Sequence, residues 1–129
     1  MQTVLIFDDD ADILELCSLI LASKGLKTVG KLNCSQLIET VNTIKPAVIL
    51  MDNWIPDIGG IAACRALKAT ESTRSIPLIF FTASNNVEKL SLEAGADYYI
   101  PKPFDIAQLE KVVLNAARTK PIKFPIIDQ

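Results

Sequence analysis

Residues 4–10 read VLIFDDD, four apolar residues followed at once by three aspartates. A short run that is apolar at every position is typical of a strand buried on both faces, as in a parallel sheet. Comparable short runs recur at 27–31, 47–51, 78–81 and 97–100. The run at 27–31 is the weakest, because Val29 is its only strongly apolar residue. We therefore expect five strands.

Longer amphipathic stretches lie between these runs. Apolar residues recur at helical spacing in the first three of them: Ile13, Leu14, Cys17, Ile20 and Leu21; Leu37, Ile38, Val41 and Ile44; Ile61, Cys64 and Leu67. Gly25 lies where a helix C-cap belongs, and Pro46 stops the second helix. Asn85 with Glu88, and Asp105 with Gln108, resemble the capping boxes that open helices.

Strands that alternate with helices of this length predict right-handed βαβ crossovers. The expected fold class is α/β, a doubly wound (βα)5 sandwich with a five-stranded parallel sheet between two layers of helices. We expect one domain over residues 1–118. Residues 119–129 contain Pro121 and Pro125 and are expected to form an apolar C-terminal tail, which either docks on the domain or a partner or begins a truncated linker.

Composition excludes several classes of protein. The chain has 129 residues, 50% hydrophobic and 22% charged, which is typical of one globular domain. The net charge of −2 and the lack of a Lys or Arg run argue against contact with nucleic-acid phosphates. No apolar run approaches the 18 or so residues of a membrane helix, and no secretory signal opens the chain, so we expect a cytoplasmic protein without membrane contact.

The chain has no histidine, and its three cysteines form no CxxC pair. Ser-His and Cys-His nucleophiles are therefore excluded. The cysteine spacing argues against a disulfide framework or a thiolate metal site, and Cys17 and Cys64 are expected in the core. Any chemistry must come from carboxylates, hydroxyls and lysines.

Those residues follow the predicted strands. Asp8 and Asp9 follow the first, Asp52 the third, Thr82 the fourth and Lys102 the fifth. The carboxyl ends of parallel strands meet at one edge of the sheet, so neighbouring first and third strands would crowd three carboxylates together. A hard divalent cation would neutralise them. An all-oxygen site with room for water and a phosphate suits Mg²⁺ better than Ca²⁺, with Mn²⁺ as a possible substitute.

A phosphoryl group beside that metal would explain the remaining side chains. Lys102 supplies a positive charge for one phosphate oxygen, and Thr82 a hydroxyl donor for another. Asp52 is left as a carboxylate nucleophile that can carry an acyl phosphate. Asp10 and Asp12 are assigned instead to the N-terminus of the first helix, where carboxylates are favourable.

Four motifs occur in order: FDDD at 7–10, MDNWIP at 51–56 followed by Gly60, FTA at 81–83 and PKPF at 101–104. Together they resemble the receiver domain of two-component response regulators, whose flavodoxin-like sheet has the strand order 2-1-3-4-5. The resemblance covers residues 1 to about 118. It implies a signalling module whose only catalysis is its own phosphorylation and dephosphorylation, and not an enzyme with a metabolite substrate.

By this resemblance, Asp52 accepts a phosphoryl group from a phosphohistidine on a sensor histidine kinase or a phosphotransfer protein. Asp8, Asp9, Asp52 and the backbone carbonyl of Trp54 would hold Mg²⁺.

The resemblance also assigns the switch. Thr82 and Lys102 would contact the phosphoryl group, Thr82 and Tyr99 would change position on phosphorylation, and the Lys102–Pro103 bond would be cis. The helix opened near Asn85, the strand at 97–100 and the helix opened at Asp105 would form the face that meets a downstream protein or output domain.

Two alternatives remain. A phosphohydrolase of the haloacid-dehalogenase type also uses an Asp nucleophile with Mg²⁺, but it usually has a second Asp two residues later, where this chain has Trp54. A pseudo-receiver would keep the fold as an interaction module and lose phosphorylation. Trp54 is also bulkier than the residues often found there, and we hypothesise that its indole screens an acyl phosphate from water.

Overall fold

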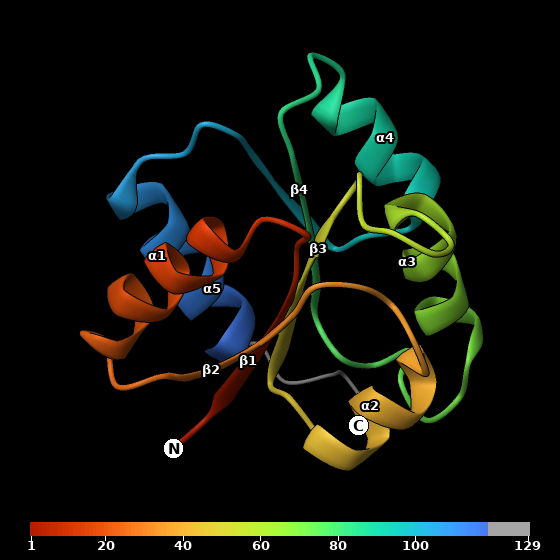
Figure 1. Cartoon of the computed structure of the whole chain (residues 1–129), viewed down its shortest axis with the longest axis horizontal. Helices are drawn as coiled ribbons and strands as arrows, with labels where there is room; N and C mark the ends of the chain where they lie inside the picture. The colour runs from red at the N-terminus through yellow and green to blue at the C-terminus, as the bar shows by residue number, and fades with distance from the viewer. Residues whose placement is uncertain (119–129) are drawn as a thin grey trace, which may run out of the picture.

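The computed structural model describes residues 1–118 and has five strands that alternate with five helices (Figure 1). In chain order these are β1 (Thr3–Phe7), α1 (Ala11–Ala22), β2 (Lys27–Lys31), α2 (Leu37–Ile44), β3 (Val48–Asp52), α3 (Gly60–Ala69), β4 (Leu78–Thr82), α4 (Val87–Ala94), β5 (Tyr98–Pro101) and α5 (Ile106–Arg118). The predicted tail at 119–129 lies outside the described residues.

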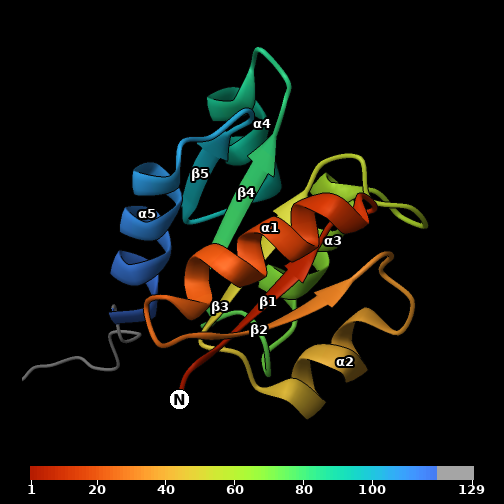
Figure 2. The ribbon, with the colours of Figure 1, turned by 60° about the vertical axis from the view of Figure 1, so that its left-hand side comes forward.

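All strand pairs are parallel, and the sheet order is β2-β1-β3-β4-β5. The predicted fold class and strand order are therefore confirmed. Helices α1 and α5 cover one face of the sheet, and α2, α3 and α4 cover the other (Figures 1 and 2). The strand order reverses between β1 and β3, the point at which doubly wound folds ordinarily bind their ligands.

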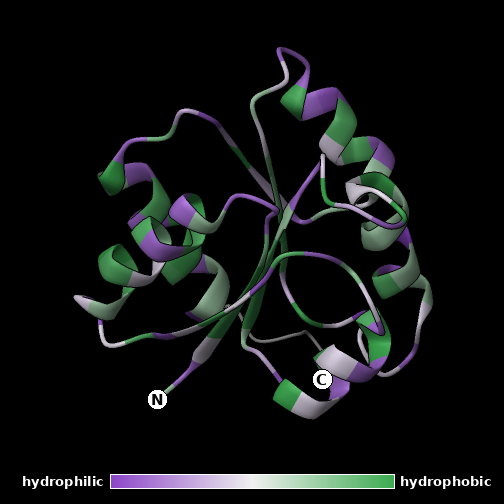
Figure 3. Cartoon of the chain, in the orientation of Figure 1, coloured by the Kyte–Doolittle hydropathy of each residue, from purple (hydrophilic) through white to green (hydrophobic). Residues whose placement is uncertain are grey.

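The core has two halves, one on each face of the sheet. Alternate residues of β1, β3 and β4 point into each half: Val4, Leu50 and Phe81 pack against α1 and α5, whereas Leu5 and Phe80 pack against α2, α3 and α4. Burial on both faces explains why these strands are uninterrupted apolar runs, visible as the green interior of Figure 3. Cys17 and Cys64 are buried free thiols, as predicted, and Cys34 is a third.

The end of α1 and the start of α5 lie where the sequence predicts them. Gly25 has φ +77°, the Leu26 N–H donates to Leu21 O at 3.2 Å, and the Gly25 N–H donates to Ala22 O at 3.0 Å. This is a Schellman closure with Gly25 in the left-handed position, which a side chain would disfavour. Asp105 caps α5, because its Oδ1 accepts from the Gln108 N–H at 2.6 Å.

The predicted capping box of the fourth helix is wrong. The N-cap of α4 is Asn86 and not Asn85, and its side chain makes no cap hydrogen bond. The Oγ of Ser84 accepts instead from the Asn86 N–H at 3.2 Å, so an upstream hydroxyl orders this turn. Strands β3 and β4 also extend one residue further than predicted, and Asp52 and Thr82 are their last residues.

None of the helices in residues 1–118 combines the length and the apolar character needed to span a lipid bilayer.

Candidate functional site

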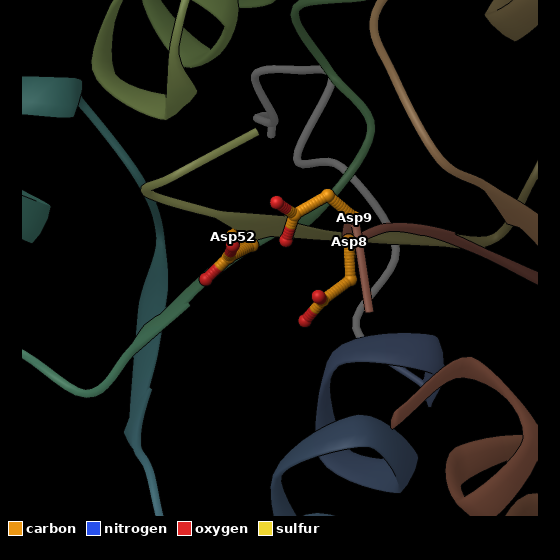
Figure 4. Close-up of side chains that lie close together, drawn as sticks. All are labelled: Asp8, Asp9 and Asp52. Atoms are coloured by element: carbon orange, nitrogen blue, oxygen red, sulfur yellow. The ribbon is translucent and has the colours of Figure 1, made fainter. Parts of the chain in front are cut away.

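The pairing of β1 with β3 brings the predicted carboxylates together. Phe7 is opposite Met51 in this ladder, so the residues that follow them, Asp8 and Asp52, reach the same edge of the sheet. Asp9 joins them from the loop after β1 (Figure 4). One carboxylate oxygen from each of the three lies within 4.8 Å of the others. The structure thus places all three predicted metal-binding side chains in one cluster.

The cluster is partly buried and partly open. Asp8 and Asp52 are buried, whereas Asp9 is exposed. The Asp8 carboxylate is oriented by the start of α1, because its Oδ1 accepts from the Asp10 N–H at 2.9 Å. Asp10 in turn is the N-cap of α1, and its Oδ1 accepts from the Asp12 N–H at 2.9 Å. The assignment of Asp10 to the helix terminus is confirmed.

Lys102 connects the two buried carboxylates. Its Nζ donates to Asp8 Oδ2 at 2.6 Å and to Asp52 Oδ1 at 3.2 Å. The backbone places the side chain there, because Lys102 follows the edge strand β5 and its N–H donates to Thr82 O at 2.9 Å. The next peptide bond, Lys102–Pro103, is cis.

Burial and the neighbouring charges act on the pKa values of Asp52 and Lys102, in part in opposite directions. Burial raises the pKa of Asp52, and the nearby charge of Asp8 raises it further, although Lys102 and a hydrogen bond from the Trp54 backbone act in the opposite direction. Burial alone would lower the pKa of Lys102, but its hydrogen bond to Asp8 and the charges of Asp52 and Asp8 raise it. Lys102 therefore stays charged at neutral pH.

The donor set fits a hard divalent cation. One ammonium faces three carboxylates, which leaves two formal negative charges without a counter-charge at this edge. All three side-chain donors are oxygens, the ligands that Mg²⁺ prefers. Asp8, Asp9 and Asp52 would hold such an ion.

The other predicted residues lie at the end of β4, in β5 and in the loop after β3, and they differ in exposure. Thr82 is fully buried at the end of β4, where its Oγ1 accepts from the Ser84 N–H at 3.4 Å. Tyr99 lies in β5 and is 40% exposed. Trp54 lies in the loop after β3, two residues after Asp52, and 70% of its surface is exposed.

Two further residues, Gly60 and Phe81, have no role assigned to them by the sequence. A Cβ on Gly60 would lie 2.3 Å from Asp52 O and 2.6 Å from Asn53 Cα, so the start of α3 touches the backbone that carries Asp52. The ring of Phe81 lies under the ammonium of Lys102, with Nζ 4.4 Å from the ring centroid. Each contact joins two different elements of the fold, so neither the spacing nor the periodicity within one element indicates it.

The family of response regulator receiver domains matches residues 4–114. The DNA-binding response regulator MtrA of Mycobacterium tuberculosis H37Rv is 34% identical over 110 residues, which are 84% of this chain and 47% of MtrA. The phosphate regulon transcriptional regulatory protein PhoB of Pseudomonas aeruginosa is 37% identical over 110 residues, 84% of this chain and 48% of PhoB. The chain thus spans about half the length of these curated relatives.

Solved structures agree with this match. A putative response regulator from Chloroflexus aurantiacus superposes with a TM-score of 0.84 at 26% identity, covering 92% of this chain and 98% of that one. The receiver domain of the sensor histidine kinase PA1611 from Pseudomonas aeruginosa, solved with magnesium in its active-site cleft, has a TM-score of 0.82 at 26% identity, covering 92% and 98%. Family match, strand order and acidic cluster agree, and the chain belongs to the response regulator receiver domains of two-component systems.

Proposed function

We propose that this domain is a phosphorylation switch that accepts a phosphoryl group on Asp52 from a phosphohistidine of a sensor histidine kinase or phosphotransfer protein. One observation carries the proposal. The buried carboxylate of Asp52 lies within a three-carboxylate cluster and touches the ammonium of Lys102 at 3.2 Å. A nucleophile, a cation site and a fixed positive charge thus occupy one edge of the sheet, as in-line phosphoryl transfer requires.

For this transfer the protein has to position the reacting groups and neutralise the charge of the phosphoryl oxygens. An Oδ of Asp52 attacks the phosphorus of the donor, a P–O bond forms as the P–N bond breaks, and the imidazole leaves with the electron pair and takes up a proton. Lys102 and Thr82 are the donors for the phosphoryl oxygens. Mg²⁺, held by Asp8, Asp9, Asp52 and the carbonyl of Trp54, would supply the charge that neutralises the transferred group.

Phosphorylation would be communicated through Thr82 and Tyr99. The Thr82 hydroxyl moves toward the phosphoryl group, Tyr99 turns from its exposed position into the vacated space, and the populations of two surface arrangements shift. The surface that changes is formed by α4, β5 and α5, and we propose that it binds a downstream protein or output domain. Among residues 1–118 we expect no direct DNA contact, although MtrA is named as DNA-binding.

The single tryptophan offers a direct test of the pocket, because Trp54 follows Asp52 by two residues and its backbone hydrogen-bonds the Asp52 carboxylate. Its fluorescence is followed while Mg²⁺ and then beryllofluoride, a mimic of the acyl phosphate, are added. We expect a saturable change with Mg²⁺ and a second change with beryllofluoride that the Asp52→Asn variant lacks. Incubation with a small-molecule phosphodonor, followed by intact-mass measurement, should add one phosphoryl group to the wild type and none to Asp52→Asn.

A pseudo-receiver predicts the opposite result. If calorimetry detects no Mg²⁺ binding and the intact mass does not change with any donor, the domain is an interaction module that does not require phosphorylation. Sustained release of free phosphate from small phosphate esters, lost in Asp52→Asn, would instead favour the phosphohydrolase.

A further inference from the structure

The ammonium of Lys102 has an aromatic ring beneath it as well as carboxylates beside it. Its Nζ lies 4.4 Å from the centroid of Phe81 and 2.6 Å from Asp8 Oδ2. A cation over the face of an aromatic ring is attracted by the quadrupole of the ring, and the attraction is stronger where water is excluded. Phe81 is fully buried and only 17% of the Lys102 side chain is exposed, so this contact is largely shielded from solvent.

The ring itself is held in place. Phe81 belongs to the interior strand β4, which lies between β3 and β5, and packs into the half of the core that faces α1 and α5. Phe104, two residues after Lys102, packs against it with ring centroids 6.0 Å apart and an interplanar angle of 38°. This tilted arrangement is favourable for aromatic pairs. Phe81 therefore presents a fixed face to a flexible side chain.

Carboxylates alone hold Lys102 only while they are free. Asp8 and Asp52 are also the residues proposed to bind a divalent cation, and Asp52 is the proposed phosphoryl acceptor, so both partners of the ammonium acquire competing ligands. A lysine without a partner regains the rotamer freedom of its four-carbon stem. The ring of Phe81 neither titrates nor binds Mg²⁺, so its attraction for the ammonium does not depend on what the carboxylates hold.

We propose that Phe81 is a positioning residue for Lys102, whose ring keeps the ammonium at the mouth of the site when Asp8 and Asp52 engage other ligands. This inference rests on the proposed function for the role of Lys102, but the contact itself can be tested separately. In the sequence, Phe81 belongs to the predicted strand at 78–81 and opens the FTA motif, and neither feature assigns it a contact with Lys102. The role becomes visible only in the folded domain, where the segment after β5 places Lys102 and Phe104 against the ring of Phe81.

The chain offers a matched control. Phe80 is the preceding residue of β4 and is also fully buried, but it points into the opposite half of the core, against α2, α3 and α4. Phe81→Leu and Phe80→Leu remove the same ring from the same strand. Urea unfolding is expected to show a comparable loss of stability in both variants, because each exchanges a buried aromatic for a smaller apolar side chain.

The first measurement is the NMR signal of the lysine εCH₂ groups, which does not depend on phosphorylation. In the wild type, one εCH₂ signal should be shifted upfield by the ring current, and its loss in Lys102→Met assigns it. We expect the shift to remain when Mg²⁺ is added, to vanish in Phe81→Leu and to persist in Phe80→Leu. A Lys102 signal at the position of exposed lysines, or one that moves there with Mg²⁺, would overturn the proposal.

The second measurement is affinity for beryllofluoride in the presence of Mg²⁺. Phe81→Leu should bind about fivefold more weakly, equivalent to about 1 kcal/mol, whereas Phe80→Leu should bind as the wild type does. In a Lys102→Met background, Phe81→Leu should have no further effect, because no ammonium remains to be positioned. An equal loss in both phenylalanine variants, or a loss that persists without Lys102, would reduce Phe81 to a packing residue.

The two readouts separate the two proposals. If the wild type does not bind beryllofluoride but shows the upfield Lys102 signal, the proposed phosphoryl site is refuted and the contact of Lys102 with Phe81 is supported. A wild type that binds beryllofluoride without that signal supports the phosphoryl site and refutes the positioning role.

Discussion

Replacing Gly60 by alanine should destabilise the domain and displace the backbone that carries Asp52. The new Cβ would lie 2.3 Å from Asp52 O and 2.6 Å from Asn53 Cα. These distances are about 1 Å shorter than non-bonded heavy atoms ordinarily approach. Both obstructing atoms belong to the backbone, so no side-chain rotation relieves the contact. Either the first turn of α3 or the end of β3 must move, and Asp52 is the last residue of β3.

The expected cost follows from two opposing contributions. Overpacking of an interior typically costs about 1–3 kcal/mol, and the upper end applies here because the neighbours are the backbone of a central strand. Alanine is the better helix former by up to about 1 kcal/mol, which offsets part of this cost at the first position of α3. We therefore expect Gly60→Ala to lower the free energy of unfolding by about 2 kcal/mol.

Urea unfolding followed by Trp54 fluorescence measures this loss as a lower midpoint with an unchanged slope. Gly30→Ala is the matched control. There the three atoms nearest to the new Cβ belong to the side chain of Leu14, and the two closest, its methyl carbons at 3.0 and 3.2 Å, can rotate away. We expect the control to change stability by less than about 1 kcal/mol. Mg²⁺ affinity should fall in Gly60→Ala and not in Gly30→Ala. A Gly60→Ala domain as stable as the wild type would refute the reasoning.

Three further predictions concern the site and the core. Asp52→Asn should stabilise the domain in EDTA at pH 7, because burial raises the pKa of Asp52 and makes its ionised form unfavourable in the folded state. The wild type is then most stable below the pKa of Asp52 in the unfolded chain, and it loses this stability as the pH rises through the pKa in the folded chain. The gain from Asp52→Asn should therefore disappear toward pH 4, and a gain unaffected by pH would contradict the prediction. Trp54→Asn should shorten the lifetime of the acyl phosphate if the indole screens it, and an unchanged rate of dephosphorylation after donor removal would count against that hypothesis. Burial raises the pKa of Cys64 to about 12, so this thiol should resist a thiol reagent at pH 8 until urea unfolds the chain. The stability that the neutral thiol contributes should decline above about pH 9, where the thiol of the unfolded chain ionises. Rapid labelling of Cys64 in the folded domain would disprove the prediction.

Much of the fold is readable from local signals. Residues 4–10 contain a buried strand and the start of the acidic cluster, and Gly25 indicates the end of α1 because only a left-handed residue closes that turn well. The capping box predicted at Asn85 failed because a hydroxyl at Ser84 competes for the same backbone donors. Prediction from local pattern is weakest where several polar residues offer alternative turns.

The sequence by itself determined which residues are available for chemistry and that each follows a strand. The tertiary structure decided which of them meet. The pairing of β1 with β3 brings Asp8 to Asp52, and the loop after β5 brings Lys102 onto both and over Phe81. The backbone contact of Gly60 likewise exists only once α3 packs against the end of β3. Periodicity and capping act within one element or at its end, whereas these contacts join different elements, and only the folded domain brings them together.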